Sequence, residues 1–207
     1  MKRAIPAATV QRLPLYLQCL DGLAAGTSLI SSEDLAAEAG VNSAKVRKDL
    51  SHLGSHGTRG VGYDVEHLRF QIQTELGLTK DRAVVIVGLG NLGRALANYD
   101  GFTERGFSIV GLFDADPRKI GDTVDDIEVE PMEALPAAVG ERGAEIGIIT
   151  TPARAAQEVA SALADAGVRS ILNFAPAVIH VGDDVEVRRV DLSTELQVLS
   201  FYLHRNE

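Results

Sequence analysis

The chain has 207 residues, of which 45% are hydrophobic and 24% are charged, proportions typical of a soluble globular protein with one large or two small domains. Its 29 acidic and 20 basic residues give a formal net charge of −9, which over the whole chain disfavours a nucleic-acid-binding protein. Residues 1–80, however, carry a net charge of +1, and the remaining 127 residues carry −10. This asymmetry indicates two domains with different partners.

Two helices are expected in the first forty residues. Residues 9–23 place apolar side chains at helical spacings of three and four, namely Val10, Leu13, Leu17 and Leu20. Ser31 and Asp34 form a capping-box start for a second helix, which ends at Gly40. Glycine tolerates the left-handed conformation that a tight turn after a helix requires.

A third helix follows this turn, with Asn42 or Ser43 as its cap. Its apolar side chains must face the core, namely Val46, Leu50 and Leu53. Its outward side is basic and polar, with Lys45, Arg47, Lys48, Ser51 and His52. Two helices joined by a tight turn, the second of them basic, predict a helix-turn-helix whose second helix enters the DNA major groove.

Residues 54–63 contain four glycines around Arg59, a density that permits a hairpin turn or a close approach of the backbone to a ligand. Such a hairpin suits the wing of a winged helix, with Arg59 as a minor-groove contact. We expect Arg47 and Lys48 to read the major groove and Lys45 to contact a phosphate. The alternative interpretation of these cations is an ordinary solvated helix face.

The chain changes character after residue 80. Continuous apolar, β-branched runs are typical of strands buried on both faces of a parallel sheet. These runs alternate with helix-like stretches such as residues 153–166, which predicts a doubly wound α/β domain. The runs lie at residues 83–87, 107–113, 146–150 and 170–174, with 185–190 as a further candidate.

A further helix is expected over residues 64–76, and residues 77–81 form a hinge or boundary after it. The tail carries an apolar stripe at helical spacing, which needs a surface to bury against: Leu192, Leu196, Leu199 and Leu203. We therefore expect a DNA-binding domain, a nucleotide-binding domain and a C-terminal helix, at residues 1–80, 81–190 and 191–207.

A glycine motif, G-x-G-x-x-G, follows the first strand of the α/β domain at Gly88, Gly90 and Gly93. It is typical of a Rossmann dinucleotide site: the first glycine makes the turn, the second lets the backbone approach a pyrophosphate, and the third brings helix and strand together. The second strand ends at Asp114, which would accept hydrogen bonds from the adenosine ribose. The alternative is a glycine-rich turn that binds no dinucleotide.

Asp114 would also repel a 2′-phosphate and so favour NAD over NADP. Arg118 and Lys119 follow it closely and could soften this preference, although two cations at the start of a loop are more often solvated.

Groups that would move a proton in a dehydrogenase are missing from the sequence. No tyrosine is followed four residues later by lysine, and His180 is expected to have a structural role. A nucleotide sensor therefore fits better than an oxidoreductase. The alternatives are a small NAD-dependent oxidoreductase and a CoA-binding or other nucleotide-binding Rossmann subunit.

The sequence resembles the Rex family of redox-sensing transcriptional repressors over nearly its whole length. The matching motifs include V-R-K-D-L-S at 46–51, G-T-R-G-V-G-Y at 57–63, G-N-L-G-R-A-L at 90–96, N-Y-D-G-F at 98–102 and L-N-F-A-P at 172–176. The resemblance implies a homodimer with winged-helix domains, Rossmann domains that bind NADH or NAD⁺, and C-terminal helices exchanged between subunits. It also implies a repressor that leaves its double-stranded, inverted-repeat operator when NADH rises relative to NAD⁺.

The resemblance also implies roles for single residues. Tyr99, in the helix after the glycine turn, and Asp191 match the family's switch, and Gln18 stands where the family has an arginine. The implied cofactor contacts are Asn91, Leu92 and Tyr99, with Asn173, Phe174, Ala175 and Pro176 near the nicotinamide. Before the resemblance is considered, Phe174 could equally be core packing at a strand end.

The compartment is expected to be the cytoplasm. Cys19 is the single cysteine, so it cannot form an intrachain disulfide or supply a cysteine metal cluster, and it is expected to be a small apolar residue on a buried helix face. No apolar run approaches the roughly 18 residues of a membrane span. We expect no membrane partner and no bound metal.

Overall fold

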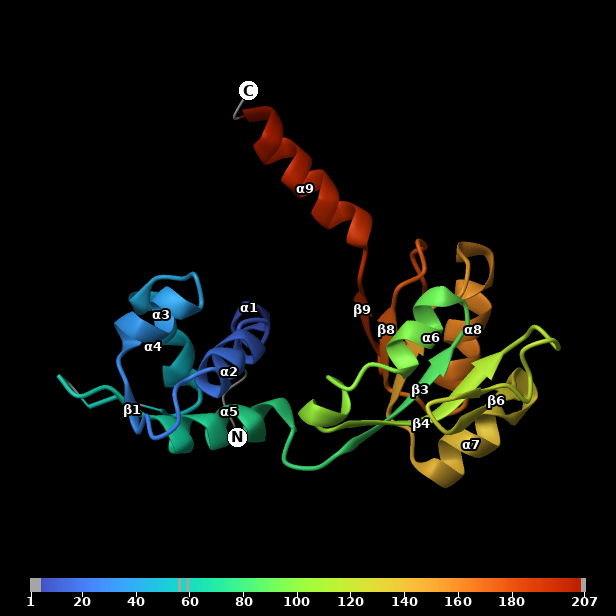
Figure 1. Cartoon of the computed structure of the whole chain (residues 1–207), viewed down its shortest axis with the longest axis horizontal. Helices are drawn as coiled ribbons and strands as arrows, with labels where there is room; N and C mark the ends of the chain where they lie inside the picture. The colour runs from blue at the N-terminus through green and yellow to red at the C-terminus, as the bar shows by residue number, and fades with distance from the viewer. Residues whose placement is uncertain (1–4, 56, 59, 206–207) are drawn as a thin grey trace. The chain divides into compact units, whose positions relative to one another are not determined.

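The computed structural model describes residues 5–55, 57–58 and 60–205. The chain divides into two compact units, and the boundary along the sequence falls between Lys80 and Asp81 (Figure 1). The elements of the first unit are α1 (Ala7–Val10), α2 (Leu13–Asp21), β1 (Leu29–Ile30), α3 (Ser32–Glu38), α4 (Ser43–His52), β2 (Tyr63–Asp64) and α5 (Val65–Leu76).

The prediction of one helix over residues 9–23 is wrong, because the helix is interrupted between α1 and α2. Pro14 lies in the first turn of α2, where its missing N–H breaks no helical hydrogen bond. Val10 therefore does not continue the buried stripe and is 42% exposed. Tyr16 is fully buried with Leu13 and Leu20 instead.

The caps predicted around the turn at Gly40 are confirmed. The Ser31 hydroxyl accepts the Asp34 N–H at 3.0 Å, and the Asn42 side chain accepts the Lys45 N–H at 2.8 Å. Val46 and Leu50 of α4 are buried as predicted, whereas Leu53 and His52 are only partly covered. The two helices and their turn thus have the helix-turn-helix layout.

A hairpin follows α4. Thr58 and Gly62 exchange two backbone hydrogen bonds of 2.8 and 2.9 Å, and β2 beyond them pairs antiparallel with β1. Gly62 has φ +107°, and a Cβ there would lie 2.4 Å from the Ile30 carbonyl oxygen. The glycine-rich segment therefore forms the wing of a winged helix, and Arg59 lies outside the described residues.

Within residues 81–205, the second unit is built on a seven-stranded sheet in the order β5-β6-β4-β3-β7-β8-β9. All neighbours are parallel except β5 and β6, so the predicted doubly wound fold is confirmed. The strands are β3 (Arg82–Val87), β4 (Phe107–Asp114), β5 (Thr123–Val124), β6 (Ile127–Pro131), β7 (Ile146–Ile149), β8 (Ser170–Asn173) and β9 (Glu186–Arg189).

Helices cover both faces of this sheet. α6 (Asn91–Ala97) packs on the face that includes Val84 and Ile86 of β3, with the short 3₁₀ turn Thr103–Arg105 leading into β4. α7 (Leu135–Arg142) and α8 (Ala153–Asp165) pack on the opposite face. Alternate residues of β3 therefore belong to different cores, which explains its continuous apolar run.

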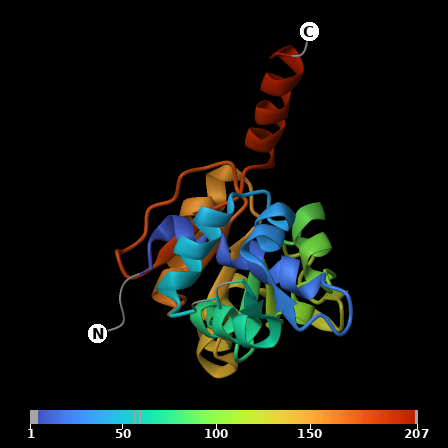
Figure 2. The same ribbon diagram turned by 90° about the vertical axis from the view of Figure 1, so that its left-hand side faces the viewer.

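The last helix, α9 (Leu192–Arg205), follows β9 and is a single unbroken helix in both views (Figures 1 and 2). None of its described residues is buried. Its large apolar side chains are between 46% and 69% exposed, namely Leu192, Leu196, Val198, Leu199, Phe201, Tyr202 and Leu203. The amphipathic tail predicted from sequence is thus present, with its apolar stripe open.

Candidate functional site

The glycine turn between β3 and α6 is held by contacts that only glycine permits at two of its three positions. Gly88 has φ +101°, and a Cβ there would lie 2.8 Å from the Thr151 methyl group. A Cβ at Gly93 would lie 2.0 Å from the Gly88 carbonyl oxygen. At Gly90, by contrast, a Cβ would meet no described atom within 4 Å. The fold therefore explains Gly88 and Gly93, whereas the space over Gly90 is open to a ligand.

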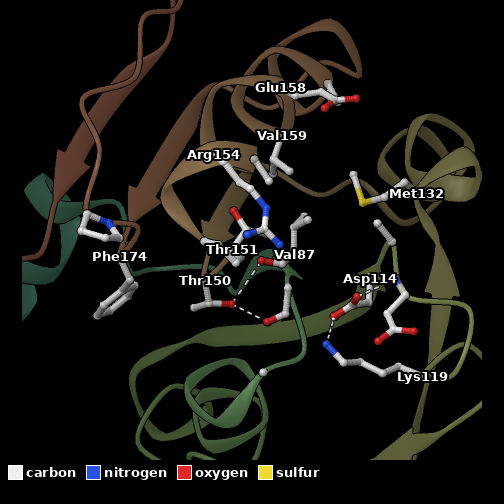
Figure 3. A pocket seen from close by; sticks show the side chains of 18 residues that line it. Val87, Asp114, Lys119, Met132, Thr150, Thr151, Arg154, Glu158, Val159 and Phe174 are labelled. Carbon is white, nitrogen blue, oxygen red and sulfur yellow. Dashed lines mark hydrogen bonds and ion pairs between the residues drawn. The ribbon is translucent and has the colours of Figure 1, made fainter.

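A cavity of about 880 Å³ opens beside this turn, at the carboxyl ends of β3, β4, β7 and β8 (Figure 3). The strand order reverses between β3 and β7, which is where doubly wound sheets bind ligands. The residues that line it are Val87, Gly88, Gly90, Asp114, Ala115, Asp116, Lys119, Met132, Thr150, Thr151, Pro152, Arg154, Ala155, Glu158, Val159, Ala162, Phe174 and Pro176.

At one end of the cavity stands the Asp114 carboxylate, which is nearly buried. Oδ2 accepts the Leu89 N–H at 2.6 Å and the Lys119 ammonium at 2.8 Å, and Oδ1 accepts the Asp116 N–H at 2.8 Å. Burial opposes ionisation, but the hydrogen bonds from Lys119, Asp116 and Leu89 outweigh it, so the pKa of Asp114 is lowered. Asp114 is therefore an anion at neutral pH, as a ribose acceptor must be.

Phe174 stands at the end of the cavity opposite Asp114 and Lys119 (Figure 3). Pro176, two residues further along the chain, also lines the cavity. Asn173 directs their loop: its amide nitrogen donates to the Ala177 carbonyl at 3.0 Å, and its amide oxygen accepts the Ala175 N–H at 2.9 Å. Asn173 is 1% exposed, so its side chain fixes the turn rather than facing the cavity.

Of the predicted cofactor residues, the lining thus includes Gly88, Gly90, Asp114, Phe174 and Pro176. The other predicted positions lie in the first turn of α6, at the buried end of β8 and in the loop after it, or beyond α6: Asn91, Leu92, Gly93, Asn173, Ala175 and Tyr99.

Sequence reasoning missed Thr150, Thr151 and Arg154 in the cavity wall. The Thr150 hydroxyl donates to the Gly88 carbonyl at 2.6 Å and so ties the end of β7 to the glycine turn. These residues could have been predicted from the expected strand at 146–150, because residues just after the carboxyl ends of neighbouring parallel strands lie at the same edge of the sheet.

Tyr99 and Asp191 have local partners in the second unit. Tyr99 lies just beyond the end of α6, not within the helix as predicted, and its ring packs edge-on against Phe102 at 5.2 Å. It is 52% exposed. Asp191 precedes α9, where it accepts from the Ser193 N–H and hydroxyl and from Arg189. The Ser193 bonds are the first cause of its lowered pKa.

In the first unit, α4 presents Lys45, Arg47, Lys48 and Ser51 on its exposed side. The Arg47 guanidinium donates to the Ser32 hydroxyl and to the Glu33 carboxylate, both at 2.9 Å, so the first turn of α3 orients it. The Ser51 hydroxyl donates to the Lys48 carbonyl at 2.7 Å. Gln18 is exposed on α2, whereas Cys19 beside it is partly covered, and this burial raises the pKa of its thiol.

Asp49 of the same helix is a buried polar residue that the sequence analysis missed. It is 2% exposed and accepts hydrogen bonds from the Arg12 guanidinium at 2.6 and 2.8 Å, from Tyr16 at 2.8 Å and from Thr9 at 2.9 Å. The spacing that places Val46 and Leu50 inside also places Asp49 there. The carboxylate thus fastens α4 to α1 and α2.

No group of three His, Cys, Asp or Glu side chains suited to a metal ion occurs among the described residues. Over the same residues, no helix combines the length and apolar character needed to cross a membrane.

Two family models match the chain. One is described as a CoA binding domain and matches residues 79–177. The other is described as the N-terminus of a putative DNA-binding protein and matches residues 4–51.

Curated relatives and solved structures match almost the whole chain. The redox-sensing transcriptional repressor Rex of Streptomyces avermitilis is 59% identical over 98% of this chain and 81% of its own. That of Carboxydothermus hydrogenoformans is 50% identical over 98% of both chains. A crystal structure of RSP in complex with β-NAD⁺ and operator DNA has a TM-score of 0.92, 37% identity, and coverage of 99% of this chain and 95% of its own. The crystal structure of RSP in complex with β-NADH has a TM-score of 0.89 and 36% identity, and the match covers 99% of this chain and 97% of its own.

Proposed function

This chain belongs to the Rex family of redox-sensing transcriptional repressors, and we propose that it binds operator DNA and is released when NADH rises relative to NAD⁺. The observation that carries the proposal is the open space over Gly90, which leads into a cavity with an ionised Asp114 at one end. The winged helix-turn-helix supplies the DNA-binding surface. We place the protein in the cytoplasm, where operator DNA and NADH are both present.

The cavity suits a dinucleotide that extends from Asp114 to Phe174. Asp114 would hold the adenosine ribose, the first turn of α6 would offer N–H groups to the pyrophosphate over Gly90, and Phe174 with Pro176 would border the nicotinamide. The two redox forms of a bound dinucleotide would differ in charge, since the nicotinamide is a cation in NAD⁺ and neutral in NADH. The apolar wall of Phe174 and Pro176 displaces water from that ring and so disfavours the cationic form.

Release from DNA requires that the two ligands prefer different arrangements of the protein. A coupling free energy of roughly 1 to 3 kcal/mol corresponds to a change of about 5- to 150-fold in operator affinity. By linkage, operator DNA must weaken NADH binding by the same factor.

A second copy of the chain is the proposed partner of α9. The open apolar stripe of this helix is too extensive for a stable solvent-exposed helix, because helices of this length depend on packing of their apolar face. A homodimer would also place two α4 helices for the two halves of an inverted-repeat operator. Tyr99 and Asp191 remain the proposed switch positions.

The oxidoreductase and CoA-binding alternatives are less well supported. The curated relatives are named as repressors, not enzymes. The match to a CoA binding domain is explained by the shared sheet, and a ribose-binding carboxylate such as Asp114 is poorly suited to the 3′-phosphorylated ribose of CoA.

The proposed function is tested by titrating NADH into the operator complex at fixed NAD⁺. We expect operator binding to fall as NADH rises, and sedimentation of the complex to give two chains per operator. An operator complex that survives saturating NADH would contradict the proposal. Additional NAD⁺ at the same concentrations is the control, because it carries the same nucleotide with the nicotinamide oxidised.

Arg47→Ala is expected to lose discrimination between operator and unrelated DNA by about 10- to 100-fold, the effect of one base-reading arginine. Its NADH affinity is expected to stay unchanged, because Arg47 belongs to the first unit. Competition binding against both DNAs measures this. Arg169→Ala, which removes an exposed cation from the second unit, is the matched control. If Arg47→Ala still discriminated between operator and unrelated DNA as wild type does, Arg47 would not be a base-reading residue.

A further inference from the structure

The Asp114 carboxylate has little acceptor capacity left for a ligand. A carboxylate offers about four acceptor positions. Leu89 and Lys119 occupy both positions of Oδ2, and Asp116 occupies one position of Oδ1. A ribose carries two neighbouring hydroxyl groups. Asp114 can accept only one of them while Lys119 remains in place.

Lys119 itself faces the cavity (Figure 3). Its side chain is 30% exposed, and its ammonium lies 2.8 Å from Asp114. An ammonium has three donors, so two remain after the bond to Asp114 and can reach a hydroxyl oxygen or a phosphate. The ribose end of the cavity therefore carries a carboxylate and an ammonium, whose charges cancel, rather than a lone carboxylate.

The neighbouring cation, Arg118, differs from Lys119 in position. It is 87% exposed and donates to both carboxylate oxygens of Asp116, at 3.0 and 2.7 Å. It is not part of the cavity lining. Arg118 and Lys119 are thus both cations in the same loop, but only the Lys119 ammonium forms an ion pair with Asp114.

We propose that Lys119 is a specificity-determining residue, which reduces the preference for NADH over NADPH that Asp114 alone would impose. The inference rests on the proposed function, since it takes the adenosine ribose to lie at Asp114. Lys119 donates to the ribose oxygen that Asp114 cannot serve. For a 2′-phosphate, it offsets the repulsion from Asp114 and donates directly to the phosphate oxygens.

The test compares the dissociation constants of NADH and NADPH, measured by calorimetry on the full chain. In Lys119→Met, the ratio of the NADPH constant to the NADH constant is expected to rise about tenfold over wild type, as for loss of one partly screened charge contact. Lys119→Arg keeps the cation and is expected to stay within about threefold of the wild-type ratio. Arg118→Met is the matched control and should change the ratio by less than about twofold.

An unchanged ratio in Lys119→Met, or an equal rise in Arg118→Met, would overturn the role of Lys119 and leave the proposed function intact. Failure of the wild-type chain to bind NADH would overturn the proposed function, and this inference with it. A rise confined to Lys119→Met supports the inference.

Discussion

Gly90→Val is expected to lose NADH affinity by about 100-fold, equivalent to an overpacking cost near 3 kcal/mol, while the protein stays folded. Gly90 has φ −77° and ψ −168°, an extended conformation that valine adopts without strain. A Cβ there meets no described atom within 4 Å, so the new side chain is expected to extend into the space over the turn. That space is where the pyrophosphate would approach the backbone.

The variant should still bind operator DNA but should no longer be released by NADH. Calorimetry with NADH and operator titrations measure the two effects. Thermal unfolding should show a loss of at most about 1 kcal/mol, because valine caps a helix less well than glycine.

Gly93→Ala is the matched comparison, since its Cβ would lie 2.0 Å from the Gly88 carbonyl oxygen. This overlap is expected to destabilise the second unit by about 1 to 3 kcal/mol. The two substitutions should thus have different effects: Gly90→Val lowers NADH affinity, whereas Gly93→Ala lowers the stability of the second unit. Normal NADH binding by Gly90→Val would show that the ligand does not use the turn.

Most elements with a strong period could be predicted from the sequence. β3, β4, β7 and β8 form continuous apolar runs, and α8 has a clear helical stripe, so each lies within a residue or two of its predicted range. β6 and α7 were not predicted. β6 alternates glutamates with apolar residues, and α7 contains Pro136 and Gly140, which weaken any helix signal.

The site was only partly predictable for a related reason. Gly88, Gly90 and Asp114 belong to one local motif, and the sequence therefore predicts their chemistry. Arg154 and Met132 reach the same cavity from α8 and from the turn after β6, and only the sheet order brings them there. Asp114 pairs with Lys119 and not with Arg118 because the two side chains point in different directions from the same loop. A loop has no regular spacing of residues from which these directions could be predicted.

Asp49→Ala is expected to destabilise the first unit by about 3 kcal/mol and to abolish tight operator binding. Removing the carboxylate leaves Arg12, Tyr16 and Thr9 without their shared acceptor. This loss of stability lies at the lower end of the range of about 3 to 5 kcal/mol for breaking a buried ion pair, since the Arg12 side chain is 24% exposed and can be hydrated. Because Asp49 holds α4 against α1 and α2, its loss also releases the second helix of the helix-turn-helix, which we propose to contact DNA.

Asp21→Ala is the matched control in the same unit. Its carboxylate pairs with Arg69 but is 55% exposed, so its loss should cost less than about 1 kcal/mol. Denaturant unfolding and operator binding measure both variants, and NADH binding should survive in both because the cavity lies in the second unit. Equal stability of Asp49→Ala and wild type would show that the buried network does not hold α4.

The same network makes the DNA-binding unit sensitive to acid. Burial disfavours the Asp49 anion, but the bonds from Arg12, Tyr16 and Thr9 outweigh burial and lower its pKa, while burial and the bond to Asp49 raise the pKa of Tyr16 to about 12. Since the unfolded chain binds the Asp49 proton more readily, this stabilisation is complete above the ordinary aspartate pKa, about 4, and is lost as the pH falls through the lower folded value. Asp49→Asn removes the titrating group and should unfold with a shallower dependence on acid than wild type. Identical acid profiles for the two proteins would mean that other carboxylates, not Asp49, control the acid stability of the first unit.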